Sequence, residues 1–333
     1  MDKLKATDPA TKVPAAPAAK PVVAAMSRSP YLADDLDAAA LAAAKARPAG
    51  LTSAQAQQVA VKKATCPFIG AAVASQGLTV RNSAASPLAA IDDVVALGNT
   101  GGGDLGKLLK LFASGNHAFM QGADGHLDAP VPAGLFSLDF PGSQGSHPGH
   151  SGILQGDPTQ LDSGRLSAPD LQRLCDRAKD GYLKRSDVAK FIAENLANDP
   201  NSKVLDGNVA KRLFGDLHQF AGTTGPALLA KLRKKDHVAE ERKLTEALTK
   251  TLGEDNLVGS AGEFGLLMAF LAHSPRSKKI GGEPAIAVAD VQAMFQDHRF
   301  PDGWEQWPKT RHDWVVNTTA LMVEAGKEFH NLK

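Results

Sequence analysis

The chain has few of the residues that usually mark a protein class. Its 333 residues include only two cysteines, two tyrosines and three tryptophans, and its formal net charge is +1. Two cysteines far apart, Cys66 and Cys175, give no basis for a disulfide framework or a cysteine-rich zinc site. The balance of charges provides no basic field for nucleic acid, so we expect no nucleic-acid partner and a small molecule instead.

Long apolar runs are missing as well. No stretch of about 18 apolar residues occurs, as a transmembrane helix would need. The N-terminal residues lack the apolar core of a secretory signal peptide. We therefore expect a soluble protein, cytoplasmic or in another aqueous compartment, with no transmembrane segment.

Alanine is abundant, and the alternation typical of strands is hard to find, so the sequence predicts a mostly α-helical fold. The Ala/Pro-rich residues 1–30 are expected to form a disordered arm, and residues 31–333 a single helical domain. Residues 274–285 are interpreted as a surface loop. Helices are expected at 33–47, 52–64, from Ser86, from Asp104, and at 167–178, 186–197, 207–220, 225–233, 237–252, 261–272, 287–297 and 310–329.

One glycine-rich stretch imitates a phosphate-binding loop. "GGGDLGK", residues 101–107, matches the first seven positions of that loop, but Leu108 stands where a magnesium-binding hydroxyl is needed. The stretch also joins two expected helices, whereas a phosphate-binding loop follows a buried strand. A glycine-rich connection between helices is the favoured interpretation.

A second stretch, "DRAKDGYLKRSD" at residues 176–187, imitates a calcium-binding EF-hand loop. Asp176 and Asp180 occupy its first and fifth positions, while Ala178 fills the third and Asp187 replaces the bidentate glutamate at the twelfth. Two readings follow, a calcium-binding interaction module or a helix-turn-helix linker with a glycine at its turn. The neighbouring Cys175 is interpreted as a small packing residue.

The other cysteine stands in "TCPFIGAAVASQGLTVRN", where Cys66 and Pro67 are followed by Gly77, Arg81 and Asn82. This pattern resembles the proximal loop of the haem-thiolate peroxidases, the chloroperoxidases and unspecific peroxygenases, in which a Cys-Pro pair opens a short helix. The resemblance implies a b-type haem with Cys66 as the axial thiolate of its iron and Pro67 beside it. A helix N-terminus is a sensible place for a thiolate because its N–H groups favour negative charge.

A second segment, "HSGILQGDPTQLDSGRL" at residues 150–166, resembles the acidic-Gly-Asp segment with which that family holds magnesium against a haem propionate. The resemblance implies a Mg²⁺ site, or a Ca²⁺ site, formed by Gln155, Gly156, Asp157 and Thr159, with Gln155 in place of the family's glutamate. In the alternative reading, Gln155 and Asp157 only hydrogen-bond the backbone of a long loop.

The family also needs an acid-base group on the distal side of the haem. In "VAKRLFGDLHQFAG", residues 209–222, a Gly-Asp pair resembles the peroxygenase Gly-Glu pair. The resemblance points to Asp216, with His218 as the second choice, and Arg212 stands in for the family's arginine. Asp216 is equally well read as a solvated carboxylate on a helix.

The resemblance follows the family's order of segments over roughly residues 60–305 and implies a chloroperoxidase-like helical domain around haem b. The expected function is a peroxidase or peroxygenase that uses hydrogen peroxide to oxidise or oxygenate a small organic substrate, since an axial thiolate favours cleavage of a bound peroxide. The alternatives are a non-catalytic calcium-binding module and a haem-binding protein without peroxygenase activity.

Overall fold

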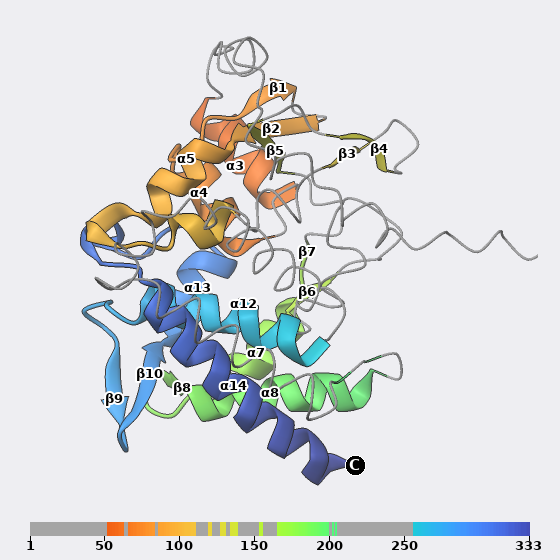
Figure 1. Cartoon of the computed structure of the whole chain (residues 1–333), viewed down its shortest axis with the longest axis vertical. Helices are drawn as coiled ribbons and strands as arrows, with labels where there is room; N and C mark the ends of the chain where they lie inside the picture. Colours follow the sequence, from red (N-terminus) through yellow and green to blue (C-terminus); the bar gives the residue numbers. More distant parts are fainter. Residues whose placement is uncertain are drawn as a thin grey trace, which may run out of the picture.

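The fold is mostly helical, as the sequence predicts, and short strands form small sheets between the helices (Figure 1). The computed structural model describes residues 52–62, 66–83, 86–110, 119–121, 127–130, 134–138, 153–155, 165–199, 202, 204 and 256–333. The predicted arm at 1–30 and the predicted helices at 33–47, 207–220, 225–233 and 237–252 lie outside these residues.

Three long helices, α8 (Arg185–Asn198), α12 (Asn256–Leu271) and α14 (Arg311–Leu332), pack against one another at one end of the molecule (Figure 1). Small residues on α12 let α14 approach closely, because a methyl group added at Gly265 would overlap the Thr318 side chain. The Trp314 indole N–H donates a hydrogen bond of 3.0 Å to the Gly262 carbonyl. The position of α12 is therefore set by backbone contact as well as by apolar packing.

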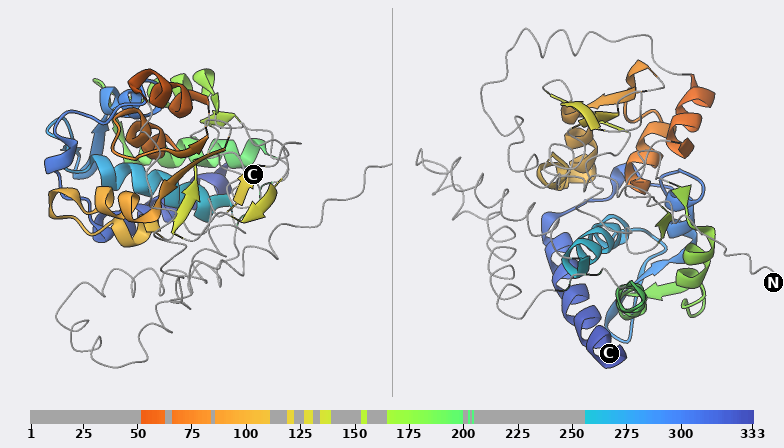
Figure 2. Two further views of the ribbon diagram at one scale, coloured as in Figure 1. Left: turned by 90° about the horizontal axis from the view of Figure 1, so that it is seen from above. Right: turned by 90° about the vertical axis from the view of Figure 1, so that its right-hand side faces the viewer.

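The N-terminal elements lie at the other end of the molecule (Figure 2). Helix α3 packs on α4, and the strands form a sheet in the order β1-β2-β5. The elements are α3 (Ser53–Lys62), α4 (Pro67–Ala74), β1 (Arg81–Ser83), β2 (Ser86–Ala90), α5 (Ile91–Gly98) and β5 (Leu135–Ser137).

The predicted helix start at Ser86 is wrong. Residues 86–90 form strand β2, and α5 begins only at Ile91. Strand β2 pairs antiparallel on both sides, with Pro87 opposite Asn82 and Leu88 opposite Ser137. Pairing with two neighbouring strands overrides the helical preference of the local alanines, because such a preference amounts to less than about 1 kcal/mol per residue.

The expected surface loop at 274–285 contains a hairpin instead. Strands β9 (Lys278–Ile280) and β10 (Glu283–Ala287) are joined by Gly281 and Gly282, whose positive φ angles of 64° and 83° permit the tight turn. Strand β10 also pairs with β8 (Tyr182–Lys184). Two further strand pairs are β3 (Phe119–Gln121) with β4 (Leu127–Pro130), and β6 (Leu154–Gln155) with β7 (Arg165–Leu166).

Five of the predicted helices are confirmed, with ends that differ by a few residues. They are α7 (Ala168–Cys175), α8, α12, α13 (Val288–Phe295) and α14. Capping explains why two of these starts could be predicted. The Ser167 hydroxyl accepts a hydrogen bond from the Asp170 N–H, and the Thr310 hydroxyl accepts one from the Asp313 N–H.

The glycine-rich stretch at 101–107 follows α5 and connects helices, as predicted. It begins in a short 3₁₀ helix, η2 (Thr100–Gly102), and packs against the residues beside a second one, η5 (Trp304–Gln306). Lys309 is buried at this junction, and its ammonium donates hydrogen bonds to the Thr100 hydroxyl and to the carbonyls of Trp304 and Trp307 at 2.6 to 2.7 Å. Burial lowers the pKa of Lys309 to about 8, so the side chain still carries its charge at neutral pH.

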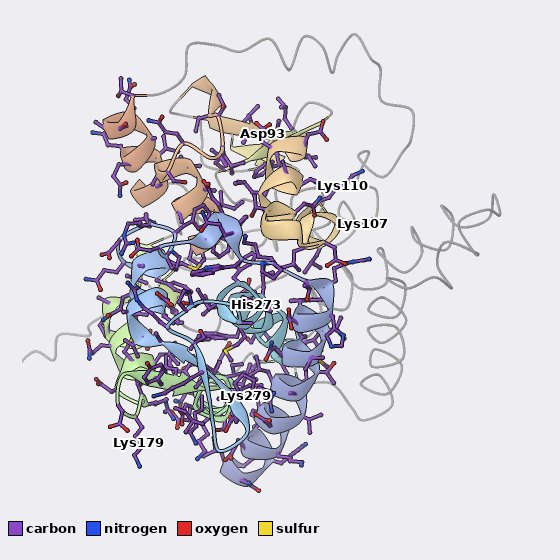
Figure 3. All side chains as sticks on the ribbon, turned by 90° about the vertical axis from the view of Figure 1, so that its left-hand side faces the viewer. Asp93, Lys107, Lys110, Lys179, His273 and Lys279 are labelled. Atoms are coloured by element: carbon purple, nitrogen blue, oxygen red, sulfur yellow. The ribbon has the colours of Figure 1, made fainter. Side chains whose placement is uncertain are left out.

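Exposed lysines lie at both ends of the molecule. Lys107 and Lys110 project from the N-terminal end, near Asp93, while Lys179 and Lys279 project from the far end (Figure 3). The labelled positive charges are thus distributed over the described surface rather than gathered on one face.

Candidate functional site

Cys66 stands immediately before helix α4, as the sequence predicts. Pro67 is the first residue of the helix, and Cys66 has extended backbone angles, φ −85° and ψ 124°. The sequence dictates this local structure, because proline suits the first helical position and disfavours helical angles in the residue before it. The Phe68 ring then stacks on Phe270 of α12, with ring centroids 4.7 Å apart, which fixes the start of α4 against that helix.

The Cys66 thiol is protonated at neutral pH. Burial raises its pKa to about 11, the backbone N–H groups of Ile69 and Phe68 oppose that rise, and the nearby charge of Glu263 adds to it. Cys66 forms no disulfide. The thiol is therefore poorly suited to act as a free nucleophile, and it needs a positive charge beside the sulfur to become a thiolate.

A pocket opens beside Cys66. Its volume is about 70 Å³, enough for a few water molecules. Its walls come from the start of α4, one face of α12, the end of α13 and the residue before β6. The described residues that line it are Cys66, Pro67, Phe68, Ile153, Glu263, Phe264, Leu266, Leu267, Phe270, Met294 and Phe295.

Glu263 is the site residue that sequence reasoning missed. It is the one charged residue in the sixteen residues of α12, and it lines the same pocket as Cys66. Glu263 is half-buried. A single charge on a helix of otherwise uncharged residues is a signal that the sequence did contain, because ionisable groups beside pockets are candidates for function. The pocket therefore combines one thiol and one carboxylate with apolar and aromatic walls.

Of the other predicted site residues, the structure describes only Gln155. Gln155 ends β6, and Ile153, two residues earlier, is buried in the wall of the Cys66 pocket. The chain thus leads from the pocket wall directly into the predicted magnesium segment. The remaining predicted residues, Gly156, Asp157, Thr159, Arg212, Asp216 and His218, lie outside the described residues.

Within the part of the chain that the structure describes, no group of three or more histidine, cysteine or acidic side chains could hold a metal ion.

The calcium-like loop at 176–187 links α7 to α8, and two of its three acidic side chains, Asp176 and Asp187, accept hydrogen bonds from the protein. The Asp176 carboxylate accepts a hydrogen bond of 2.6 Å from the Gln172 amide, and the Asp187 carboxylate accepts one of 2.9 Å from the Lys184 N–H. Leu183, in the middle of β8, pairs with Ile286 of β10. This arrangement stabilises the turn and the start of α8.

Strand β10 leads into α13 and to a second acidic residue with protein partners. The carboxylate of Asp290 is fully buried, and it accepts hydrogen bonds from the Ser274 hydroxyl at 2.6 Å and the Arg276 guanidinium at 2.8 Å. Arg276 also contacts Asp302, which precedes η5. These contacts hold the start of α13, whose last residues, Met294 and Phe295, line the pocket.

Comparisons of the chain with protein-family models, curated proteins and solved structures found no match. No helix in the described residues is long and apolar enough to cross a membrane.

Proposed function

We propose that the protein is a haem-thiolate peroxidase or peroxygenase, which uses hydrogen peroxide to oxidise or oxygenate a small organic substrate. One observation carries the proposal. A thiol at the start of a helix and a carboxylate on another helix line one apolar pocket. These are the protein groups that peroxide chemistry at a thiolate-bound haem requires, one as ligand and one as acid-base group.

Haem b would enter this pocket only if its walls move apart, since the pocket volume of about 70 Å³ is far smaller than a porphyrin. The pocket walls include four phenylalanines and other apolar side chains that suit the faces of a porphyrin. Cys66 supplies the single soft ligand that a haem iron needs from this side. When bound, the haem supplies the cleavage of peroxide and the oxidation of substrate, while the protein positions the reactants.

Cys66 would hold the iron through its sulfur. Burial favours the neutral thiol, so the positive charge of the metal has to displace the thiol proton, as metals do with cysteine ligands generally. The helix N–H groups of Ile69 and Phe68 lower the thiol pKa and so favour the thiolate form. Pro67 fixes the chain direction and leaves those two N–H groups available to the sulfur.

We assign the acid-base role to Glu263 because its carboxylate lines the same pocket as Cys66. With haem bound, this carboxylate would accept a proton from peroxide and could donate it again as a general acid. Apolar surroundings keep competing water away from this proton transfer. Asp216, with His218 and Arg212, stays a sequence prediction outside the described residues, so a test of Glu263 also tests that earlier assignment.

The predicted Mg²⁺ site at Gln155, Gly156, Asp157 and Thr159 belongs to the proposal as well. Its support is the buried Ile153, because this residue puts the start of the segment beside the pocket. A cation there would balance the negative charge of a haem propionate.

Peroxide turnover tests the proposed function. The full chain, loaded with haem, is expected to oxidise a chromogenic phenol with hydrogen peroxide, and Glu263→Gln is expected to lower kcat/KM for peroxide by about 100-fold or more, since general acid-base groups contribute that much. Glu263→Asp, the matched control, keeps a carboxylate and should retain more activity. A Glu263→Gln variant as active as the wild type would return the acid-base role to Asp216. Haem-loaded protein with no turnover would leave only a haem-binding function.

A further inference from the structure

The pocket beside Cys66 is bordered by two helices that follow one another in the chain. Helix α12 supplies Phe270 and several residues before it, and the end of α13 supplies Met294 and Phe295. The pocket volume is about 70 Å³, whereas sites for organic ligands usually measure about 300 Å³ or more. A larger molecule therefore reaches the Cys66 thiol only if these walls move apart, and the contacts between α12 and α13 control that movement.

An acidic residue at the start of α13 is tied to the chain that leaves α12. The fully buried carboxylate of Asp290 accepts hydrogen bonds from the Ser274 hydroxyl at 2.6 Å and the Arg276 guanidinium at 2.8 Å. Ser274 is itself fixed to the end of α12, because its N–H donates to the Leu271 carbonyl at 3.1 Å. The Arg276 guanidinium also donates to Asp302, which follows α13, at 3.2 Å. These contacts form a clamp, the Asp290 clamp, between the end of α12 and helix α13.

The pair α12–α13 has a counterpart in the pair α7–α8, which flanks the calcium-like loop. Strands β8 and β10 pair with each other, and each leads directly into the second helix of its pair. Asp187 and Asp290 are both the third residue of that helix, so Asp290 occupies the place of the last ligand in a calcium loop. In calcium sensors, the bound cation sets the angle between the two helices. At Asp290 the positive charge comes from Arg276 of the same chain.

The clamp acts on the pocket wall through α13. Met294 lies four residues after Asp290, about one turn further along the same face of the helix. The chain just before α13 is held separately, because β10 pairs with β8. When the clamp is released, α13 stays attached at this strand and can turn about it. Such a turn carries Met294 and Phe295 away from Phe270 and widens the pocket.

We propose that the Asp290 clamp is a conformational device that holds the Cys66 pocket closed, and that its release admits molecules larger than the pocket to the thiol. The release breaks hydrogen bonds and no covalent bond. The Arg276 side chain is 46% exposed, so water can take over its hydrogen bonds while the clamp is open. The opening serves any ligand of the pocket, and the inference does not depend on haem.

Site-resolved thiol labelling of the full chain tests the clamp, because the two cysteines have different surroundings. Cys66 lines the pocket, whereas Cys175 is buried in α7. The probe is a fluorescent maleimide, which is larger than the pocket, and mass spectrometry of the peptides gives the labelling rate of each cysteine. Arg276→Ala is expected to raise the rate at Cys66 by about tenfold, the effect of one charge-assisted hydrogen bond on a local opening equilibrium. The rate at Cys175 should stay unchanged.

Two further variants separate the clamp from other effects. Arg299→Ala is the matched control, since Arg299 contacts Asp302 at 3.3 Å and follows α13, so both rates should stay at the wild-type value. Ser274→Ala removes the second donor to Asp290 and should raise the Cys66 rate by a smaller factor. A Cys66 rate in Arg276→Ala equal to the wild type would overturn the clamp. A parallel rise at both cysteines would also overturn it, because it would show general unfolding in place of pocket opening.

Discussion

The pocket at Cys66 and the calcium-like loop at 176–187 both carry residues of a known functional pattern, but the structure gives these residues different surroundings. In the loop, the carboxylates of Asp176 and Asp187 accept hydrogen bonds from the chain around them. In the pocket, Cys66 and Glu263 line a space bordered by apolar side chains. The two regions differ in what surrounds the pattern, which is a turn and a helix start in the loop and an apolar pocket at Cys66.

Asp290, beside the same β8–β10 strand pair, gives the largest expected effect on stability. Asp290→Ala should lower the free energy of unfolding by about 2 kcal/mol, because it removes the hydrogen bonds that the buried carboxylate accepts and leaves the buried Ser274 hydroxyl without this partner. Urea unfolding of the purified protein measures the change. The control Asp302→Ala removes the other carboxylate that contacts Arg276, and it should cost less than about 0.5 kcal/mol since Asp302 is 79% exposed. Equal losses in the two variants would contradict the structural role of Asp290.

The smallest change in the free energy of unfolding is expected when calcium is added, because the loop is not expected to bind it. A site that binds an ion at a hundred times its Kd stabilises a protein by about 2.7 kcal/mol, and we expect no such gain from residues 176–187. Urea unfolding with and without calcium chloride measures it, in the wild type and in Asp176→Asn. A calcium-dependent gain in the free energy of unfolding that vanishes in Asp176→Asn would show that the loop binds calcium, which would contradict this account of the loop. A gain that persists in the variant would instead point to the predicted cation segment at 155–159.

Sequence reasoning found the long helices because their apolar spacing and caps are local signals. Ser167 and Thr310 mark helix starts in the sequence as they do in the structure. The strands were missed because their signals are not local. Ser86–Ala90 becomes a strand only through its pairing with β1 and β5, and the hairpin after residue 277 depends on β10 lying against β8.

The candidate site was found in part for a similar reason. The Cys66-Pro67 pair specifies its own geometry, since the proline both starts the helix and restricts the residue before it. Glu263 was missed although it is the one charge in an apolar helix, because its distance of almost two hundred positions from Cys66 in the sequence hides a contact that only the fold creates.

The identity of the axial ligand tests the central claim most directly. The haem-loaded full chain is reduced under carbon monoxide, and its absorption spectrum is compared with those of Cys66→Ala and Cys175→Ala. We predict a strongly red-shifted Soret band, typical of thiolate-bound haem, in the wild type and in Cys175→Ala, whose cysteine is buried in α7. The band should be absent in Cys66→Ala. A Cys66→Ala variant that keeps the red-shifted band, or a wild type that never shows it, would contradict the account.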